Sequence, residues 1–160
     1  MAETGSLTFS EQHHNAMTVA LEQARIAVSE GEVPVGAVVL NAEGKIVARA
    51  HNMTRSGDPT AHAEVLAIRQ AAAAGGSARS TLEDHTLVVT LEPCSMCAGA
   101  ILASRIHTVV FGSWDDKAGA AGSVFDLLRD RRLPHRCEVV AGLMADQSAK
   151  ILAEFFEERR

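Results

Sequence analysis

The segment TLVVTLEPCSMCAGAIL, residues 86–102, limits the possible folds most strongly. Its first part, TLVVTL, is short, β-branched and apolar, which is typical of a strand buried on both faces. Pro93 follows, and because proline favours the first helical turn we expect a helix from Pro93 to about Ser104. Cys94 and Cys97 would then begin this helix. The segment therefore predicts a layered α/β fold with two thiols at the end of a central strand.

The rest of the chain alternates between predicted helices and predicted strands. A helix is expected over residues 11–30, capped by Ser10 and ended by Gly31, with an apolar face that comprises Met17, Ala20, Leu21, Ala24 and Val28. Further strands are expected at 35–40, 45–50, 107–112 and 137–143, and further helices at 61–74, around 124–128, and from a cap at Asp146 to Arg160. This order predicts a three-layer α/β/α sandwich with a mixed sheet of about five strands, in a single domain of residues 1–160.

The composition excludes several classes of protein. Apolar residues make up 47% of the 160 residues, which excludes a disordered chain and suffices for a sizeable core. No apolar run approaches the roughly 20 residues of a membrane-spanning helix, and the N-terminus lacks a secretion signal. We therefore expect a cytoplasmic protein without membrane contact, whose thiols stay reduced. The net charge of −5 argues against broad nucleic-acid binding, although the arginines of residues 129–136 allow a local basic patch.

A second motif helps to interpret the two cysteines. His62 and Glu64 lie at the start of the helix predicted for residues 61–74. One imidazole and two thiolates are ligands that zinc prefers, and three protein ligands leave a fourth position for water, whose pKa zinc lowers to about 7. Glu64 is then the carboxylate available to move a proton. The pattern predicts a catalytic zinc site with His62, Cys94 and Cys97 as ligands and Glu64 as the proton shuttle.

Two other interpretations of the Cys-x-x-Cys motif stay open. A redox Cys-x-x-Cys pair would leave His62 and Glu64 without a role. A zinc site that only supports the fold would be expected to have four protein ligands, whereas the sequence supplies three and a carboxylate. The remaining cysteine, Cys137, has no partner at ligand spacing and is expected to be a small core residue.

The H-x-E and P-C-x-x-C motifs together resemble the signature of the zinc-dependent cytidine/deoxycytidylate deaminase superfamily. Within it the chain is most similar to the bacterial tRNA-specific adenosine deaminases, in segments that include GEVPVGAVV, DPTAHAE, VTLEPCSMCAGAI, DDKAGAAGS and FFEERR. The resemblance implies the cytidine deaminase-like fold, Zn²⁺, a homodimer, and hydrolytic deamination of adenosine to inosine at the wobble position of tRNA(Arg), with the anticodon stem-loop as partner. The alternative within the superfamily is a deaminase of free nucleobases or nucleosides such as guanine or cytosine.

The resemblance also implies substrate contacts for residues outside the zinc motifs: Asn52, Ala63, Asp115, Lys117, Phe156 and Arg160. Ala63 would contribute its backbone N–H. For Asp115 and Lys117 a salt bridge within the loop is the alternative interpretation. Trp114 is expected either to stack on a base or to cover a dimer contact. Ala118, Glu157 and Glu158 depart from the family pattern at positions that concern RNA affinity rather than the chemistry.

Overall fold

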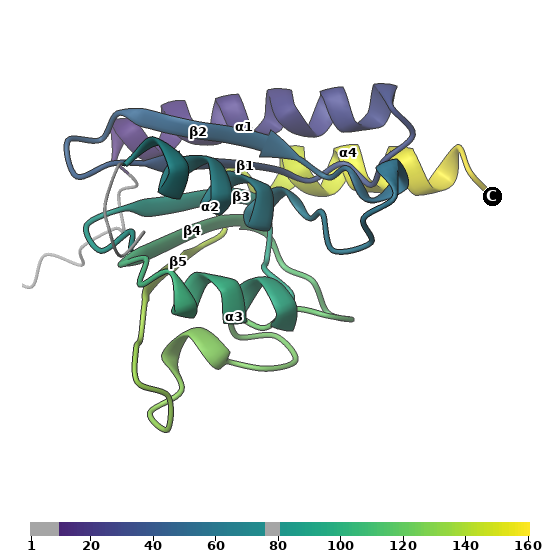
Figure 1. Ribbon diagram of the computed structural model, residues 1–160. Helices are drawn as coiled ribbons and strands as arrows, with labels where there is room; N and C mark the ends of the chain where they lie inside the picture. Colours follow the sequence, from purple (N-terminus) through teal and green to yellow (C-terminus); the bar gives the residue numbers. More distant parts are fainter. Residues whose placement is uncertain (1–9, 76–80) are drawn as a thin grey trace, which may run out of the picture.

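The computed structural model describes residues 10–75 and 81–160. Within them one sheet has the strand order β2-β1-β3-β4-β5 and carries helices on both faces (Figure 1). The strands are β1 (Gly36–Leu40), β2 (Ile46–His51), β3 (Thr86–Leu91), β4 (Thr108–Ser113) and β5 (Glu138–Ala141). The α-helices are α1 (Glu11–Ser29), α2 (Ala63–Ala74), α3 (Ser95–Ala103) and α4 (Ala145–Glu157), and the 3₁₀ helices are η1 (Thr54–Ser56) and η2 (Leu127–Arg129).

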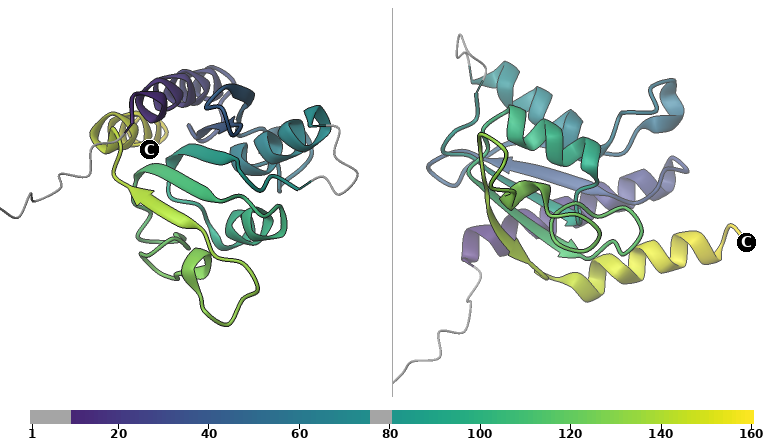
Figure 2. Two further views of the ribbon diagram at one scale, coloured as in Figure 1. Left: turned by 90° about the vertical axis from the view of Figure 1, so that its left-hand side faces the viewer. Right: turned by 90° about the horizontal axis from the view of Figure 1, so that it is seen from below.

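The sheet is mixed. β1 pairs antiparallel with β2 and with β3, whereas β3, β4 and β5 run parallel. Helices α1 and α4 lie on one face of the sheet, and α2 and α3 lie on the other (Figures 1 and 2). The predicted three-layer sandwich is therefore confirmed. None of the helices in the described ranges is long and apolar enough to cross a membrane.

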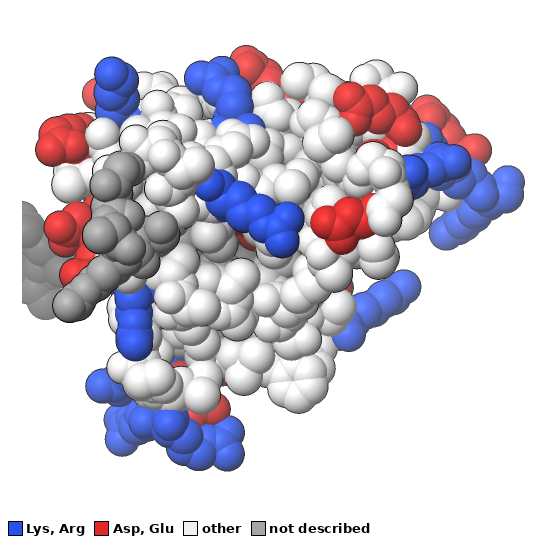
Figure 3. Space-filling view, viewed as in Figure 1, with Lys and Arg blue, Asp and Glu red and all other residues white. Residues whose placement is uncertain are grey.

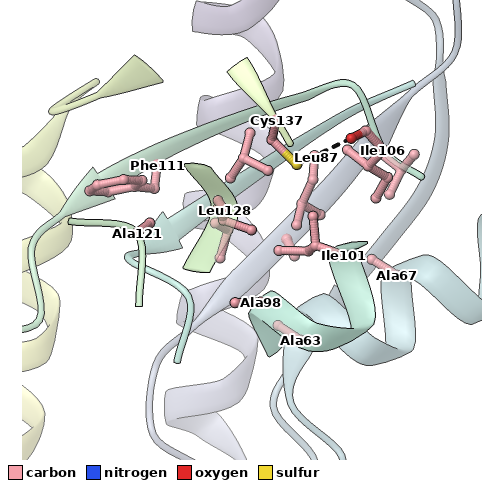
Figure 4. Packing of buried hydrophobic residues seen from close by; sticks show 14 of the residues in the cluster. Ala63, Ala67, Leu87, Ala98, Ile101, Ile106, Phe111, Ala121, Leu128 and Cys137 are labelled. Carbon is pink, nitrogen blue, oxygen red and sulfur yellow. Dashed lines mark hydrogen bonds between the residues drawn. The ribbon is translucent and has the colours of Figure 1, made fainter. Parts of the chain in front are cut away.

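Buried side chains of alternating direction hold the three layers together. In β1, Ala37 and Val39 join the core beneath α2 and α3, while Val38 and Leu40 join the core beneath α1. This period of two is what a strand buried on both faces requires. Small residues of α2 and α3, among them Ala67 and Ala98, pack against larger side chains of the sheet (Figure 4). Their small size lets both helices lie close to the sheet.

The two helices that carry the zinc motifs begin later than predicted. Pro93 precedes α3 instead of opening it, and Cys94 is its N-cap in an extended conformation (φ −75°, ψ 175°). The later start of α3 is due to contacts outside the helix. The carbonyl of Pro93 accepts the N–H of Ala120 at 2.7 Å, and the backbone of Cys94 pairs with that of Gly119 in a single β-bridge. His62 is likewise an extended N-cap, so α2 begins two residues after its predicted start.

Elements at the C-terminal end also differ from prediction. The helix expected around 124–128 is only η2, and β5 is shorter than residues 137–143 because the extended conformation ends at Gly142, which has φ 89°. Met144, at φ 53°, is the N-cap of α4, so Asp146 lies in the first turn and is not the cap. α4 ends at Glu157, before the predicted Arg160.

The first helix agrees closely with its prediction. The hydroxyl of Ser10 accepts the N–H of His13 at 3.1 Å, and Gly31, at φ 74°, ends the helical segment. The predicted apolar face is buried except at Val28, which is half-buried, while the neighbouring Ala27 is fully buried. Cys137 is buried, as expected.

Candidate active site

Three side chains that can bind a metal meet where α2 and α3 begin. Nδ1 of His62 lies 3.7 Å from Sγ of Cys94 and 3.5 Å from Sγ of Cys97. The ligand atoms of all three residues lie within 4.8 Å of one another. Across residues 10–75 and 81–160, no other group of three His, Cys, Asp or Glu residues meets this spacing. The fold thus brings together the donors that the two separate motifs predicted.

The spacing of these donors fits zinc. With Zn–N about 2.05 Å and Zn–S about 2.3 Å, a tetrahedral site places nitrogen and sulfur ligands about 3.6 Å apart. The observed distances of 3.5 and 3.7 Å lie on either side of this value. The donor set and its geometry are therefore those of a zinc site with three protein ligands.

The two thiols influence each other's ionisation. The hydrogen bond with Cys97 lowers the pKa of Cys94 to about 4, whereas the same contact, together with burial, raises the pKa of Cys97. One thiolate therefore forms readily, and the second forms only when a cation compensates its charge. The hydrogen bond with Cys94 also raises the pKa of His62, so metal binding at this site releases protons.

Glu64 lies beside this cluster in the first turn of α2 and is 4% exposed. Burial raises the pKa of its carboxyl group. A carboxyl group with a raised pKa holds a proton more readily and is suited to accept a proton and pass it on. The arrangement can therefore combine a metal with a proton-transfer group.

Two adjoining cavities open at the carboxyl ends of β3 and β4, where an α/β sheet usually receives its ligand. The inner cavity, about 260 Å³, is lined by residues from both motifs and from neighbouring loops: Val33, Val35, Asn52, Thr54, His62, Glu64, Leu91, Glu92, Cys94, Asp115 and Ala118. The outer cavity, about 450 Å³, shares Val33, Leu91, Asp115 and Ala118 with it and adds Trp114, Asp116, Lys117, Leu152 and Phe156. A ligand in the inner cavity can therefore extend into the outer one.

The structure brings Asn52 to the inner cavity but does not bring Ala63 there. Oδ1 of Asn52 accepts the N–H of Ala63 at 2.8 Å, and Ala63 is fully buried. The amide that we expected to meet the substrate is thus already engaged within the protein. Asn52 is tied to the start of α2 and so has a fixed place beside His62 and Glu64.

The loop after β4 contributes to both cavities. Asp115 is half-buried, and its Oδ1 accepts the N–H groups of Lys117 at 3.1 Å and Ala118 at 3.2 Å. These side-chain-to-backbone bonds take the place of the salt bridge between Asp115 and Lys117 that the sequence left open. Trp114 is 50% exposed and packs edge-to-face on Phe111, with ring centroids 4.9 Å apart.

The end of α4 is divided between the cavity and the protein surface. Phe156 is 52% exposed and lines the outer cavity, while Phe155 is buried. Arg160 is exposed and lines neither cavity. The guanidinium of Arg159 lies 3.5 Å above the centre of the Phe155 ring. Of the C-terminal residues predicted to meet substrate, the fold brings only Phe156 to the site.

The arginine-rich segment 129–136 also lines neither cavity. Arg129 pairs with Asp126 at 3.0 Å, and Arg132 pairs with Asp130 at 2.7 Å. Figure 3 shows Lys and Arg side chains gathered at the lower end of the molecule, below α3. These arginines are therefore not part of the site that the cavities define.

Sequence reasoning missed Glu92. This residue is 2% exposed, and its carboxylate accepts hydrogen bonds from backbone N–H groups of Asp115, Ala121 and Ser123 and from the hydroxyl of Ser123. Burial alone would raise the pKa of Glu92, but these hydrogen bonds outweigh it and lower that pKa. The signal was an acidic residue directly after a buried strand, since a buried carboxylate needs partners.

Comparison with known proteins agrees with this geometry. Residues 10–113 match the family described as the cytidine and deoxycytidylate deaminase zinc-binding region. The chain is 46% identical over 145 residues to a tRNA-specific adenosine deaminase of Bacillus subtilis (strain 168), covering 90% of this chain and 88% of that protein.

Solved structures are also similar over most of the chain, among them the following two. One, from studies of A-to-I editing by tRNA:A34 deaminases at the wobble position of transfer RNA, has a TM-score of 0.81 and 42% identity, covering 86% of this chain and 99% of the other. A guanine deaminase from Nitrosomonas europaea has a TM-score of 0.71 and 26% identity, covering 89% of this chain and 83% of the other. Because the family match spans most of the chain and agrees with the donor cluster, this protein belongs to the cytidine and deoxycytidylate deaminase family and is a zinc-dependent deaminase.

Proposed function

We propose that this protein deaminates adenosine to inosine at the wobble position of tRNA(Arg). The observation that carries this proposal is the outer cavity, which adjoins the inner one and presents Trp114 and Phe156. A free base needs only the inner cavity, whereas a nucleotide within a strand needs room for its neighbours, and aromatic side chains provide stacking surfaces for bases. The similarity to a tRNA-specific adenosine deaminase supports adenosine in tRNA as the substrate.

The proposed chemistry assigns a task to each of the four residues of the two motifs. His62, Cys94 and Cys97 hold the zinc, which when bound supplies Lewis-acid activation of water. Glu64 takes a proton from the attacking water and gives it to N1 of the adenine ring. Glu64 then takes the proton of the hydroxyl group added at C6 and gives it to the departing amino group, so that adenosine and water yield inosine and ammonia. Its burial favours this role, because water outside the site does not compete for the proton.

Residues around the reacting ring orient the substrate. Asn52 contacts the nucleoside, held in place by its hydrogen bond to the amide of Ala63. Asp115 and Lys117 meet the strand beside the target base. Phe156 and Trp114 give the neighbouring bases apolar surfaces. Arg160 would meet phosphate only outside the cavities.

We also propose that the chain is a single domain, residues 1–160, and that it acts as a homodimer. The surface over α3 in Figure 3 carries few charged side chains, and the exposed Met53 and Met96 adjoin the site in sequence. Exposed methionine side chains beside a surface with few charges favour contact with another protein chain. Light scattering in solution is expected to give twice the mass of the 17.0 kDa chain.

The test is inosine formation on an arginine-tRNA anticodon stem-loop, with ammonia release from guanine, cytosine, adenosine and cytidine measured in parallel. Inosine at the wobble position is expected, with suppression by salt, because contacts with phosphates release counterions. A Glu64→Gln variant serves as the control and should form inosine roughly 1,000-fold more slowly. Ammonia from a free base together with an unmodified stem-loop would reject the tRNA substrate and assign the protein to the free-base deaminases.

A further inference from the structure

We infer that Glu92 is a positioning residue that fixes the loop of residues 114–123, and with it the wall that the two cavities share. For its effect on substrate this inference rests on the proposed function. Asp115 and Ala118 of this loop line both cavities, so the place of the loop sets the passage between them. Glu92 acts on the substrate through these residues and is not itself assigned a step in the chemistry.

The carboxylate of Glu92 accepts hydrogen bonds from both ends of the loop. One oxygen accepts the N–H of Asp115 at 3.0 Å, and the other accepts the N–H groups of Ala121 at 2.9 Å and Ser123 at 3.1 Å. The Ser123 hydroxyl lies 2.7 Å from the carboxylate and also 2.7 Å from the carbonyl oxygen of Asp115. A charged acceptor therefore joins the beginning of the loop to its end, and such charge-assisted bonds are stronger than neutral ones.

Glu92 can act as a fixed anchor because its own backbone belongs to the sheet. Its N–H is donated to the carbonyl of Ser113 at 2.9 Å, at the end of β4. The backbone carbonyl of the next residue, Pro93, accepts the N–H of Ala120. The backbone of Cys94 pairs with that of Gly119 in a single antiparallel β-bridge. Three successive residues thus connect the loop to the segment that carries a metal ligand. The position of the loop is consequently set relative to the metal-binding cluster.

The packing around Gly119 supports the same conclusion. A Cβ atom at this position would collide with the carboxylate of Glu92 and with the hydroxyl of Ser123. The loop therefore lies against the carboxylate without space for a methyl group. The remaining side of the loop is open, since Trp114, Asp116 and Lys117 are exposed. Without Glu92, the hydroxyl of Ser123 would still bond the carbonyl of Asp115, but this neutral bond would replace four bonds to a charged acceptor.

The test replaces Glu92 by glutamine, which keeps the shape of the side chain but turns one acceptor into a donor that faces N–H groups. For Glu92→Gln we expect KM for the stem-loop to rise about tenfold while kcat stays within about twofold and zinc remains at one per chain. Glu83→Gln, the same change at an exposed position, should leave both constants unchanged. A KM within about twofold of the wild-type value, or a loss confined to kcat or zinc content, would overturn the inference.

A second measurement is independent of the substrate. Amide hydrogen exchange at Asp115, Ala121 and Ser123 should accelerate about tenfold in Glu92→Gln and stay unchanged in Glu83→Gln. Unchanged exchange at these amides rejects the anchoring role, whatever the activity. A wild-type protein that leaves the stem-loop unmodified rejects the proposed function, while the exchange rates still decide whether Glu92 anchors the loop. If Glu92→Gln does not fold, Ser123→Ala takes its place, with KM expected to rise about threefold.

Discussion

Two glutamates at the same cavity, Glu64 and Glu92, are almost equally buried but differ in their surroundings. Glu64 is 4% exposed and lies beside the metal-binding cluster, and burial raises its pKa. Glu92 is 2% exposed, and hydrogen bonds from the 114–123 loop lower its pKa in spite of burial. Solvent exposure therefore does not distinguish them. Several hydrogen-bond donors face the carboxylate of Glu92 and keep it ionised, whereas burial favours the protonated form of Glu64, which suits the proton transfer proposed for it.

The surroundings of the two glutamates are built differently. Around Glu64, the starts of α2 and α3 bring together metal-ligand side chains whose negative charges need a cation. Around Glu92, the loop supplies hydrogen bonds that compensate the carboxylate fully within the protein. The first region is expected to depend on metal and the second is not.

Removal of zinc gives the largest expected effect. Dialysis against a chelator should reduce deamination at least about 10,000-fold, because water is no longer activated. Hydrogen exchange should accelerate at the starts of α2 and α3 and remain slow at Ala121 and Ser123. Re-addition of zinc should restore activity. Equal loss of protection in both regions would contradict the distinction between them.

Replacement of Glu64 by glutamine should reduce kcat roughly 1,000-fold, because the amide cannot transfer the proton. Zinc content should stay at one per chain, and the free energy of unfolding should stay the same or rise, since a buried ionisable group is removed. The rate of inosine formation gives kcat, metal analysis gives the zinc content, and urea unfolding gives the free energy of unfolding. A variant that keeps more than a tenth of the wild-type kcat would exclude Glu64 as the shuttle.

Replacement of Glu92 by glutamine, unlike that of Glu64, should make the protein less stable. We expect the free energy of unfolding to fall by about 2 kcal/mol, because buried N–H groups lose a charged acceptor. Urea unfolding of Glu92→Gln beside Glu83→Gln measures the difference. If Glu92→Gln were as stable as Glu83→Gln, the hydrogen bonds of Glu92 would not contribute to folding.

Replacement of Trp114 by alanine tests the outer cavity, which is formed in part by the 114–123 loop. KM for the stem-loop should rise about tenfold, as expected for the loss of one stacked base. Phe125→Ala is the matched control, because Phe125 is an exposed aromatic residue that lines neither cavity. An identical KM for both variants would remove Trp114 from the substrate path.

The smallest effect concerns pH. The pKa of Glu92 in the folded protein lies below its ordinary value of 4.5, so its contribution to stability is complete above that value and is lost as pH falls through the folded-state pKa. The difference in unfolding free energy between wild type and Glu92→Gln should therefore shrink below about pH 4.5. Glu32, whose pKa is also lowered, stays in both proteins and does not affect this difference. A difference that is constant down to pH 3 would contradict the prediction.

Much of the architecture could be predicted from local patterns. The β3 strand was predicted with its observed bounds, because β-branched apolar residues in a short run have few other solutions. The predicted start of α3 was wrong by two residues, since proline only tends to occupy the first helical turn and does not always do so. What displaced it is a bond between Pro93 and Ala120, a partner far along the chain.

By itself the sequence determined the alternation of strands and helices and the identity of the metal donors, because periodicity and ligand chemistry are properties of short segments. Only the tertiary structure decided the distances of 3.5 and 3.7 Å between the His62 nitrogen and the two sulfur atoms. It also decided that Ala63 is engaged by Asn52 and that Glu92 holds the 114–123 loop. The physical reason is that a buried polar group must find a partner, and which partner reaches it depends on how distant segments pack.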